Sequence, residues 1–529
     1  MRPEGEWTTS FIADDSEIRA RQHIAADSLT TSPNGKNSVQ LPIRINFRSP
    51  HTLQTQIVEQ FQDLILSGRL PPGYEVPSSR ELSEQLRVSR NTVTEAYGHL
   101  VEEGYLHTRR SLGTFVAKTT PDDSIAACRQ QPLQRRLNHD RVVSLPLPCT
   151  GRGSPGLHQP SNHLFSYDFA LGRTDPKSFP DKIWRRLILD CLGGAPVRMS
   201  EYIDPAGLPE LRQLITNILG PMRGMVVSPE QVIIVAGCQQ GLNLAAHLFI
   251  GTGARVAIES PCYRGAAFLF ESYGARLVPV PVDELGIDVG RLPGPPVKLV
   301  CVTPSHQFPT GVTLSLDRRI ALLEWAAEVG AYILEVDYDA DFRYEDSPLP
   351  SLQALDRYGC VIYMSSFSRS IGPGLRLGYV VVPRDLIRAA TTLKGLTDNG
   401  LPWLEQATLA RFIRDGSLVH HLKRIRYTYR RRRDALVRAL HSHFGDIEIS
   451  GAESGMHLVW RLPRHLPPAH ELQVTARSCG VGIYCLRNSP AYLYEQMEDC
   501  DRILLLGYTS LTEEHIEEGI AALAQALRQ

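Results

Sequence analysis

Apolar residues recur every three or four positions between residues 53 and 66, a spacing that predicts a helix with one buried face. Pro71-Pro72 ends this pattern, and Ser78 and Ser89 are each placed to start a further helix. From residue 106 to 116 apolar and polar positions alternate, which indicates two short strands. Three helices followed by a hairpin predict a winged helix-turn-helix.

Short apolar runs separated by amphipathic stretches fill the rest of the chain from about residue 164. The runs 232–235, 255–258, 299–302 and 332–334 are apolar on both faces. Strands of this kind are buried on both sides and are typical of a mainly parallel sheet covered by helices. We therefore expect a multidomain protein, with a mainly α winged helix followed by an α/β domain.

Composition divides the chain into four segments. Residues 1–45 are polar and rich in serine and threonine, which predicts a disordered tail. Residues 46–118 hold the predicted winged helix. Residues 119–163 contain Pro, Gly, Gln, Ser and Arg without periodicity, as linkers do, and residues 164–529 hold the α/β domain.

Total charge and cysteine content exclude several classes of protein. The 529 residues carry a net charge of -1, so a contact with nucleic acid has to come from local placement of arginine. Ten cysteines are scattered without a C-x-x-C pair, which argues against a metal site and against a secreted disulfide framework. No apolar run is long enough for a membrane span or a signal peptide, and we expect a cytoplasmic protein that binds no membrane.

The start of the third predicted helix carries side chains suited to reading DNA. Ser89 is placed to cap this helix, which leaves its first exposed turn free to enter a major groove. Arg90 suits a guanine edge and Asn91 an adenine or a phosphate, while other arginines would hold the DNA backbone. The predicted DNA-binding residues are Arg80, Ser89, Arg90, Asn91, Thr92, Thr94, Arg109 and Arg110.

A winged helix that binds protein instead of DNA is the alternative, because residues 46–118 contain eight basic and eight acidic side chains. We favour double-stranded DNA, since the start of the third helix carries Arg90 and no acidic residue. Such binding should be strongly salt-dependent, because DNA releases counterions when a protein binds its phosphates.

The segment from Val76 to Val116 resembles the winged helix of the GntR family. It contains the family's succession P-S-x-R-x-L, S-R-x-T-V, A-x-x-x-L and G-T-F-V. The wing departs from that pattern, because Arg110-Ser111-Leu112-Gly113 stands where glycine-serine-glycine is usual. The resemblance implies DNA binding, with the contacts of the wing left open.

The second part of the chain resembles fold type I aminotransferases, which bind pyridoxal 5′-phosphate (PLP). The motif T-P-S-H-Q-F-P-T-G at 303–311, together with a GntR module, is similar to the MocR-type transcriptional regulators in particular. That resemblance implies a homodimer that senses a small-molecule effector, either an amino acid or PLP itself. The other matching segments, in the family's order, are Phe179–Arg186, Tyr202–Gly207, Gly237–Gln240, Pro261–Arg264, Ser366–Arg369 and Arg376–Tyr379.

The matching positions supply the groups that a phosphorylated ring requires. A phosphate needs N–H groups at a helix start, hydroxyls and a guanidinium, and the ring needs a flat partner and a hydrogen-bond donor. Tyr202 matches a tyrosine that comes from the partner subunit. The predicted ligand-binding residues are Tyr202, Gly237, Cys238, Gln239, Tyr263, His306, Tyr338, Ser366, Ser368, Arg369 and Arg376.

Two positions depart from the catalytic members of the family. Arg369 replaces the Schiff-base lysine of S-x-S-K, and a guanidinium is not a nucleophile. Val336 replaces the aspartate that binds the pyridine nitrogen, and Asp337 should point away because side chains alternate along a strand. None of the seven lysines of the chain falls in another cofactor motif.

The sequence therefore predicts a DNA-binding transcriptional regulator whose aminotransferase-like domain senses a small anionic effector and has no catalytic residues. PLP would be held there without a covalent bond. Arg264 is a further candidate for binding a carboxylate, and so is Arg502, although a solvated strand-end residue is the favoured interpretation of Arg502. The alternatives are an active aminotransferase with a DNA-binding domain, a domain that only dimerises, and a conformation in which Asp337 turns inward.

Overall fold

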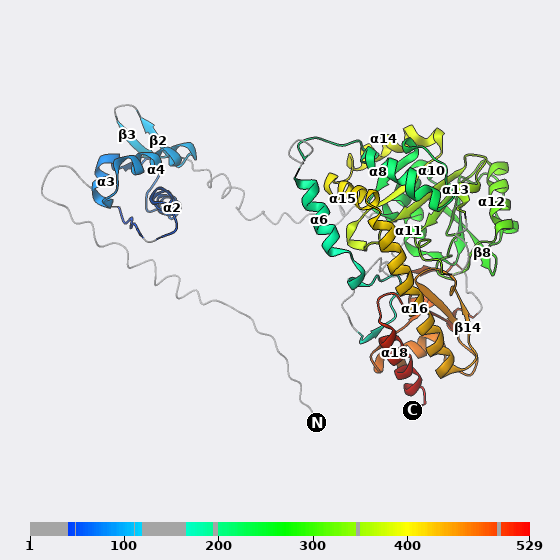
Figure 1. The fold of residues 1–529 in the computed structure, drawn as a ribbon. Helices are drawn as coiled ribbons and strands as arrows, with labels where there is room; N and C mark the ends of the chain where they lie inside the picture. Colours follow the sequence, from blue (N-terminus) through cyan, green and yellow to red (C-terminus); the bar gives the residue numbers. More distant parts are fainter. Residues whose placement is uncertain are drawn as a thin grey trace, which may run out of the picture. The chain divides into compact units, whose positions relative to one another are not determined.

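The computed structural model describes residues 41–47, 49–109, 112–118, 165–193, 199–344, 350–494 and 499–528 of the chain. They belong to two compact units that divide between Val143 and Ser144 (Figure 1). No helix in these ranges is long and apolar enough to cross a membrane.

The first unit contains the predicted helices and hairpin. Its elements are α2 (Leu53–Leu66), β1 (Glu75–Val76), α3 (Ser79–Leu86), α4 (Arg90–Glu102), β2 (Leu106–Arg109) and β3 (Gly113–Val116). Ser78 caps α3 by accepting a hydrogen bond from Glu81 N, and Ser89 caps α4 by accepting one from Thr92 N. The sequence pattern does not predict β1, which pairs with β3 in a sheet of order β1-β3-β2. The predicted helix-turn-helix is confirmed.

The first described residues correct the predicted end of the tail. Leu41 and Ile43 are only 4 % and 6 % exposed, and they pack in the same core as Phe61. The backbone of Arg44 exchanges two hydrogen bonds with the side chain of Gln60. Residues 41–45 therefore belong to the folded unit, because their apolar side chains complete a small core. The rest of the predicted tail and the predicted linker lie outside the described residues.

The second unit is built on a mixed, mostly parallel sheet. Its strands are β5 (Val232–Val235), β6 (Arg255–Ser260), β8 (Arg276–Asp283), β9 (Gly286–Ile287), β10 (Leu299–Val302), β11 (Tyr332–Asp337), β12 (Val361–Ser366) and β13 (Gly378–Val381). Among the described residues these eight strands lie in the order β5-β13-β12-β11-β10-β6-β8-β9. Strands β8, β6, β10, β11 and β12 are parallel to one another, whereas β13 runs antiparallel to both of its neighbours. The predicted α/β fold is confirmed.

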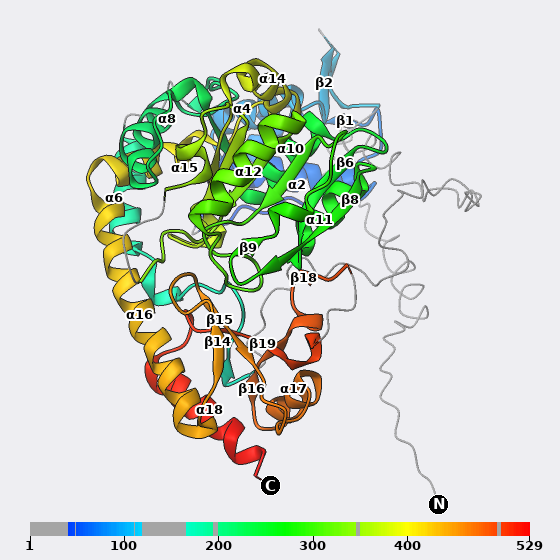
Figure 2. The ribbon, with the colours of Figure 1, turned by 90° about the vertical axis from the view of Figure 1, so that its right-hand side faces the viewer.

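Helices cover both faces of this sheet (Figure 2). The described helices of the second unit are α6 (Asp181–Leu192), α8 (Pro209–Leu214), α9 (Gly220–Met222), α10 (Cys238–Phe249), α11 (Arg264–Ser272), α12 (Leu316–Val329), α13 (Leu352–Leu355), α14 (Ile387–Asp398), α15 (Trp403–Arg414), α16 (Ser417–Phe444), α17 (Ala469–Ser478) and α18 (Glu513–Ala526), of which α17 and α18 lie away from the large sheet. Helices α10, α11 and α14 share a core with Ile258 and Leu334, while α12 and α13 share another core with Ala257 and Ile333. Neighbouring residues of one strand thus enter opposite cores, as strands apolar on both faces require.

Helix α16 runs from the large sheet to a smaller antiparallel sheet (Figure 2). That sheet consists of β14 (Glu448–Ser450), β15 (His457–Arg461), β19 (Ile503–Gly507) and β17 (Tyr484–Cys485). Shorter pairs are β4 (Tyr167–Asp168) with β16 (Val481–Gly482) and β7 (Cys262–Tyr263) with β18 (Ala491–Tyr492).

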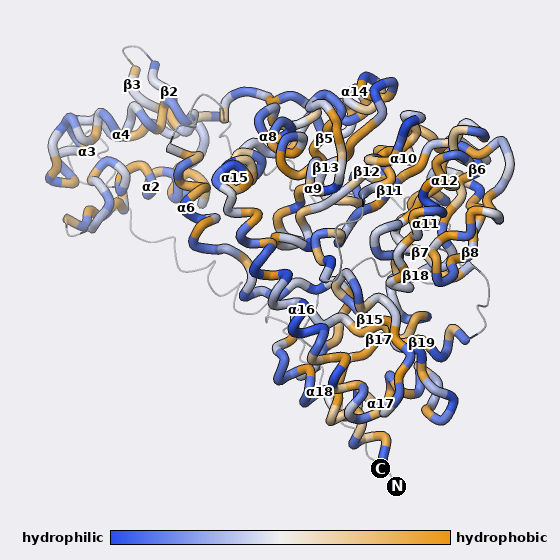
Figure 3. The backbone as a smooth tube through the Cα atoms, turned by 45° about the vertical axis from the view of Figure 1, so that its right-hand side comes forward, coloured by the Kyte–Doolittle hydropathy of each residue, from blue (hydrophilic) through white to orange (hydrophobic). Residues whose placement is uncertain are grey.

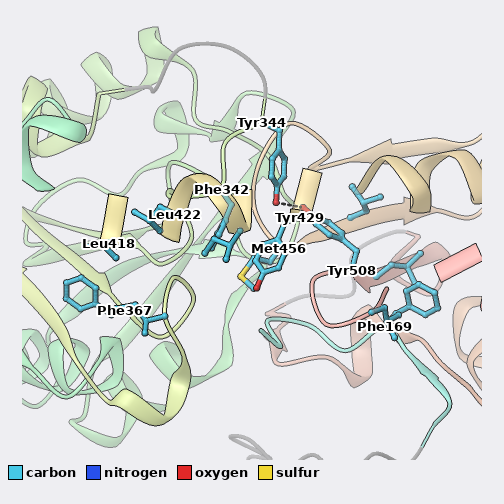
Figure 4. Close-up of a cluster of buried hydrophobic side chains, with 14 of the residues drawn as sticks. Phe169, Phe342, Tyr344, Phe367, Leu418, Leu422, Tyr429, Met456 and Tyr508 are labelled. Atoms are coloured by element: carbon cyan, nitrogen blue, oxygen red, sulfur yellow. Dashed lines mark hydrogen bonds between the residues drawn. The ribbon is translucent and has the colours of Figure 1, made fainter. Parts of the chain in front are cut away.

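An aromatic cluster joins the small sheet to the large one (Figure 4). Tyr344 and Tyr508, whose hydroxyls are 3.2 Å apart, each donate a hydrogen bond of 2.7 Å to the carbonyl of Gly455. Tyr429 of α16 and Met456 lie in the same buried cluster. Hydrophobic colour is prominent on the interior strands in Figure 3, whereas α16 carries long hydrophilic stretches. The loop at Gly455 is therefore anchored by buried rings from two segments.

Candidate functional site

Three neighbouring strand ends bring the predicted phosphate-binding residues together. Ser366, the last residue of β12, pairs with Gly378, which in turn pairs with Val235 at the end of β5. The chain then turns at Gly237, whose φ of 82° suits glycine, and α10 begins at Cys238. Because the first N–H groups of a helix have no partner within it, this corner is suited to an anion.

Arg376 and two serines complete this corner. Arg376 donates a hydrogen bond of 2.6 Å to the carbonyl of Ala236, and a Cβ atom at Gly237 would lie 3.1 Å from its guanidinium. The hydroxyls of Ser366 and Ser368 are 2.9 Å apart. We call Gly237, Cys238, Ser366, Ser368 and Arg376 the cradle.

The thiol of Cys238 adds no charge to the cradle. Desolvation raises the pKa of Cys238 to about 11, although Arg369 and Arg376 act in the opposite direction. The thiol is therefore protonated at neutral pH, and the two guanidinium groups dominate the electrostatics of the corner.

Tyr263 lies beside the cradle at the start of α11. Its ring meets Phe308 edge to face, with 6.0 Å between the ring centroids. Burial raises the pKa of Tyr263, and the nearby charges of Arg369 and Arg376 lower it. The aromatic side chain therefore lies within electrostatic range of both guanidinium groups, and we call the space that Tyr263, Arg369 and Arg376 border the candidate pocket.

His306 and Tyr338 form a polar group that Phe308 joins to Tyr263, since the Phe308 ring centroid lies 6.0 Å from that of Tyr263 and 6.3 Å from that of Tyr338. Nδ1 of His306 is 3.1 Å from the Tyr338 hydroxyl and 2.9 Å from Oδ2 of Asp339. Since a carboxylate can only accept, Nδ1 of His306 carries the hydrogen. Burial raises the pKa of Tyr338 well above its usual value, so the phenol remains a hydrogen-bond donor.

The side chains of two predicted residues, Tyr202 and Gln239, make no hydrogen bond with the cradle in the described part of the chain. Tyr202 is 89 % exposed, and no hydrogen bond or ring contact links it to the cradle in the described part of the chain. Gln239 is half-buried in the first turn of α10, and its side chain has no hydrogen-bond partner among the described residues.

Arg369 follows Ser368 directly and enters the same pocket. Its charge acts on Cys238, Tyr263, Tyr338 and His457. No lysine is in the pocket among the described residues. Lys394 is buried and bound to Asp398 at 2.5 Å, and the remaining described lysines are exposed: Lys118, Lys177, Lys182, Lys298 and Lys423.

Val336 and Asp337 lie on opposite faces of β11, as strand alternation predicts. Val336 packs in the core that also touches Cys238 and Tyr263. Asp337 accepts hydrogen bonds from Arg223 Nε at 2.8 Å and from the Tyr363 hydroxyl at 2.7 Å. The carboxylate therefore faces away from the cradle, and the conformation in which it turns inward does not occur in this structure.

Buried charge accumulates behind this strand. Arg223 contacts Asp337 at 2.6 Å and also donates to Ser305, while Glu335 accepts hydrogen bonds from the backbone of Leu352 and Gln353. Burial and the neighbouring Asp337 raise the pKa of Glu335. Arg223 thus compensates the buried charge of Asp337 directly, and the buried guanidinium of Arg319 also acts on Glu335 and Asp337.

The residues present fit the phosphate of PLP and not its covalent chemistry. The cradle supplies N–H groups, hydroxyls and a guanidinium for a phosphate. Arg369 cannot form the covalent bond to the aldehyde, and the apolar Val336 cannot hold a proton at a pyridine nitrogen. Among the described residues, no group of His, Cys, Asp and Glu is placed to hold a metal ion.

The two other candidate carboxylate-binding arginines have structural partners. Arg264 Nη2 donates to the carbonyls of Ser489 and Ala491, both at 3.0 Å. Arg502 donates to backbone carbonyls, including Leu466 at 2.9 Å. Arg264 and Arg502 are therefore not free carboxylate clamps, and the interpretation of Arg502 as a merely solvated strand-end residue is wrong, because backbone carbonyls bind its guanidinium.

Glu259 was not predicted, because its partners come from a distant loop. It is 4 % exposed, and its Oε2 accepts hydrogen bonds from Thr303 N, Thr303 Oγ1 and Gln307 Nε2. Burial raises the pKa of Glu259 to about 7, while the Thr303 and Gln307 bonds oppose this shift. Asp339 and Gly172 were also missed. Asp339 could have been found from its place beside Tyr338, whereas nothing local marks Gly172.

Glu259→Gln is expected to flatten the pH dependence of stability. The folded pKa of Glu259 is raised from 4.5 to about 7, so the folded state binds the extra proton between these values. The stabilisation that comes from this proton is fully present below pH 4.5 and is lost as the pH rises to 7. The free energy of unfolding should fall by about 3 kcal/mol at most over this range. All three hydrogen bonds end on Oε2, so glutamine can keep them through its amide oxygen.

Urea unfolding from pH 5 to pH 8, followed by tryptophan fluorescence, measures this slope. Four of the five tryptophans lie in the second unit (Trp184, Trp325, Trp403 and Trp460). The exposed Glu328 on α12 provides the control, because Glu328→Gln should leave the slope unchanged. A slope in Glu259→Gln equal to that of the parent protein would contradict the prediction.

The candidate DNA-reading residues lie at the start of α4 and on its neighbours. Arg90, Asn91 and Thr94 are exposed, and Arg90 Nε is 3.4 Å from Ser79 Oγ. The side chains of Ser89 and Thr92 are engaged in capping, with 2.8 Å between their oxygens.

Two arginines flank that surface. Arg80 pairs with Glu84 at 3.4 Å, and Arg109 lies over the ring of Phe115. Arg110 lies outside the described residues. The structure thus leaves Arg90 and Asn91 as the polar side chains at the helix start with the fewest internal contacts.

Comparison with known proteins matches both units. Residues 53–116 match the model of the gntR family of bacterial regulatory proteins, and residues 174–523 match aminotransferase class I and II. The chain is 35 % identical over 515 residues to the HTH-type transcriptional regulator TauR of Rhodobacter capsulatus, covering 96 % of this chain and 100 % of TauR. It is 33 % identical over 478 residues to the probable rhizopine catabolism regulatory protein MocR of Rhizobium meliloti, covering 90 % and 93 %.

A solved structure supports the fold of the second unit. The kynurenine aminotransferase of Pyrococcus horikoshii is 29 % identical, with a TM-score of 0.61, over 68 % of this chain and 90 % of that protein. A helix-turn-helix unit and an aminotransferase-like unit thus occur in one chain. The chain belongs to the MocR-type family of GntR helix-turn-helix transcriptional regulators that carry an aminotransferase class I and II domain.

Proposed function

We propose that this regulator binds operator DNA through α4 and that its second unit senses a small anionic effector without covalent catalysis. The observation that carries the proposal is Arg369 beside an otherwise assembled phosphate cradle. A permanent cation there favours an anion and forms no Schiff base. The candidate effectors are PLP held non-covalently, an amino acid, or a related metabolite.

A gel shift with DNA from the protein's own promoter region tests the regulatory part of the proposal. We expect a sequence-selective complex that weakens as salt increases. Added effector should change its affinity, because a ligand that prefers one conformation shifts the population toward it. Absence of a selective complex would remove the DNA claim.

PLP added to the purified protein is expected to remain removable. Arg369 offers no nucleophilic amine, so borohydride treatment should leave no pyridoxyl group on the protein. Mass spectrometry of the treated protein measures this directly. Arg369→Lys is the comparison, because it places an amine at the same position and should gain attachment if the pocket accepts PLP.

A pyridoxyl group trapped on any lysine of the unaltered protein would favour the alternative, an active aminotransferase joined to a DNA-binding domain. That alternative draws on the likeness to the kynurenine aminotransferase. The other alternative is a unit that only dimerises. It predicts no thermal shift with PLP, amino acids or phosphorylated metabolites, whereas binding raises stability by RT ln(1 + [L]/Kd).

We also propose that the protein is a homodimer. Tyr202 is 89 % exposed, and apolar side chains near it in sequence are exposed as well, with Leu189 at 61 % and Met199 at 60 %. A contact with a second copy of the chain would bury these exposed apolar side chains. Light scattering of the full chain tests this, and a monomeric mass at micromolar concentration would contradict it.

A further inference from the structure

Arg369 is the cation in the pocket that lacks a structural partner. Among the described residues its guanidinium has no hydrogen bond and no ion pair within 4.0 Å, in contrast to Arg264, Arg376 and Arg502. The carboxylates that act on the same tyrosine, Tyr338, are engaged elsewhere: Asp339 binds His306, and Glu259 binds Thr303. A guanidinium left without a carboxylate in a partly buried pocket is costly unless a ligand supplies the anion.

Gly172 defines the position of this guanidinium. Its φ is +64°, and a Cβ atom built there would lie 2.4 Å from both terminal nitrogens of Arg369. The segment around Gly172 is held in place, since Arg173 pairs with Asp168 at 2.9 Å and Thr509 Oγ1 donates to the Arg173 carbonyl at 2.5 Å. Arg369 thus lies flat against a fixed backbone, which reduces the freedom it loses when it binds an anion.

The second cation, Arg376, is separate from Arg369 in its contacts. Arg376 lies against Gly237 at the helix start, whereas Arg369 lies against Gly172. Ser368, which precedes Arg369, lies in the cradle beside Ser366 at 2.9 Å, and Arg376 lies in the same cradle against Gly237, so the two cations border one space. One side of that space has the donors of a phosphate site, and the other has a single planar guanidinium, whose fork matches a carboxylate.

We propose that Arg369 forms a carboxylate subsite and that the effector carries two anionic groups, a phosphate in the cradle and a carboxylate on Arg369. This inference rests on the proposed function, because it requires the cradle to bind a phosphate without a covalent bond. The ligand class is a phosphorylated molecule that bears a carboxylate, such as a phosphopyridoxyl group already joined to an amino acid. Val336 in place of an acid suits such a ligand, since no charge on the ring is required.

Two ligands that differ only in the carboxylate test the subsite. N-(5′-phosphopyridoxyl)-L-leucine has both anionic groups, and N-(5′-phosphopyridoxyl)-3-methylbutylamine is the same molecule without the carboxylate. Neither has an aldehyde, so covalent attachment cannot contribute. Calorimetric titration of the full chain should give an affinity at least about ten-fold higher for the leucine conjugate, as expected for a charge-assisted hydrogen bond.

Variants then show which residue causes the difference in affinity between the two ligands. In Arg369→Gln the ratio of the two affinities should fall close to one, whereas Arg376→Gln should weaken both ligands and keep the ratio. Arg369→Lys should give an intermediate ratio, because it keeps the charge and loses the fork. The control is Arg276→Gln. Arg276 is exposed at the start of β8, whereas the cradle lies at the carboxyl ends of strands β12 and β5. Both affinities of this variant should equal those of the parent protein.

The titration distinguishes failure of the carboxylate subsite at Arg369 from failure of the proposed phosphate cradle. Equal affinities in the parent protein would overturn the carboxylate subsite and leave the phosphate cradle standing. A preference for the conjugate that persists in Arg369→Gln would assign the carboxylate to another residue and would also overturn the inference. No binding of either ligand at millimolar concentration would overturn the proposed effector pocket itself.

Discussion

Replacement of Arg223 by methionine is expected to lower the free energy of unfolding of the second unit by about 3–5 kcal/mol. Arg223 and Asp337 are 11 % and 0 % exposed, and Glu335 lies two residues away on the same face of β11. Without the guanidinium, Asp337 keeps only Tyr363 as a partner in a medium of low dielectric. An unpaired buried carboxylate costs more than the methionine side chain can gain.

The effect should depend on pH with a defined sign. Burial and the neighbouring Asp337 already raise the pKa of Glu335, and loss of the Arg223 charge, which acts on Glu335, raises this pKa further. A raised carboxyl pKa gives stability at low pH that is lost as the pH rises. The difference between Arg223→Met and the parent protein should therefore be smaller at pH 5 than at pH 8. Urea unfolding followed by tryptophan fluorescence measures both values.

An exposed pair with the same geometry provides the control. Arg487 Nε donates to Asp501 at 2.8 Å, as Arg223 does to Asp337, yet the side chains of this pair are 51 % and 45 % exposed. Arg487→Met should therefore lower the free energy of unfolding far less than Arg223→Met does. A double variant, Arg223→Met with Asp337→Leu, should recover part of the loss. Equal costs for the two single variants would show that burial does not set the energy of the pair.

Arg90→Ala is expected to lower the affinity for operator DNA about ten- to hundred-fold while leaving the affinity for unrelated DNA nearly unchanged. Arg90 is the first residue of α4 and is exposed, so its guanidinium can reach a base edge. A bidentate arginine–guanine contact contributes about 1–3 kcal/mol of discrimination. Fluorescence anisotropy with both DNA duplexes at one fixed salt concentration measures this selectivity.

Arg69→Ala is the matched control for the winged helix. Arg69 is exposed in the turn that follows α2 and carries the same charge as Arg90. It does not belong to α4, the helix proposed to enter the major groove. Its loss should lower both affinities by a similar small factor, as expected for a general electrostatic contribution. If Arg90→Ala also weakened both duplexes equally, Arg90 would be a phosphate contact and not a reader of bases.

Local sequence patterns predicted most of the fold because the relevant interactions are local. Ser78 and Ser89 cap their helices through the N–H groups three residues ahead, and the apolar runs at 232–235 and 332–334 form buried strands. The missed strand β1 has two residues and is formed by pairing with a distant strand. The predicted end of the tail at residue 45 was wrong, because Leu41 lies in a polar segment that has no helical or strand periodicity. Its burial depends on a core formed by residues later in the chain.

The candidate ligand site was predictable in part, since its residues belong to separate short motifs. Motif matches indicated Ser366, Arg376 and the Gly237 turn, and strand alternation indicated that Asp337 points away from Val336. The partners of these residues were not predictable. Asp337 pairs with Arg223, which lies 114 positions earlier, and no local rule selects that arginine from the others.

By itself, the sequence determined which chemistry is available: Arg369 and Val336 exclude a lysine amine and an acid at those two positions, whatever the fold does. Only the tertiary structure decided which arginine is free, because carbonyls from distant segments engage Arg264 and Arg502 while Gly172 leaves room for Arg369. The physical reason is that a side chain's chemical type is covalent, whereas its charge compensation and exposure depend on what the folded chain packs around it.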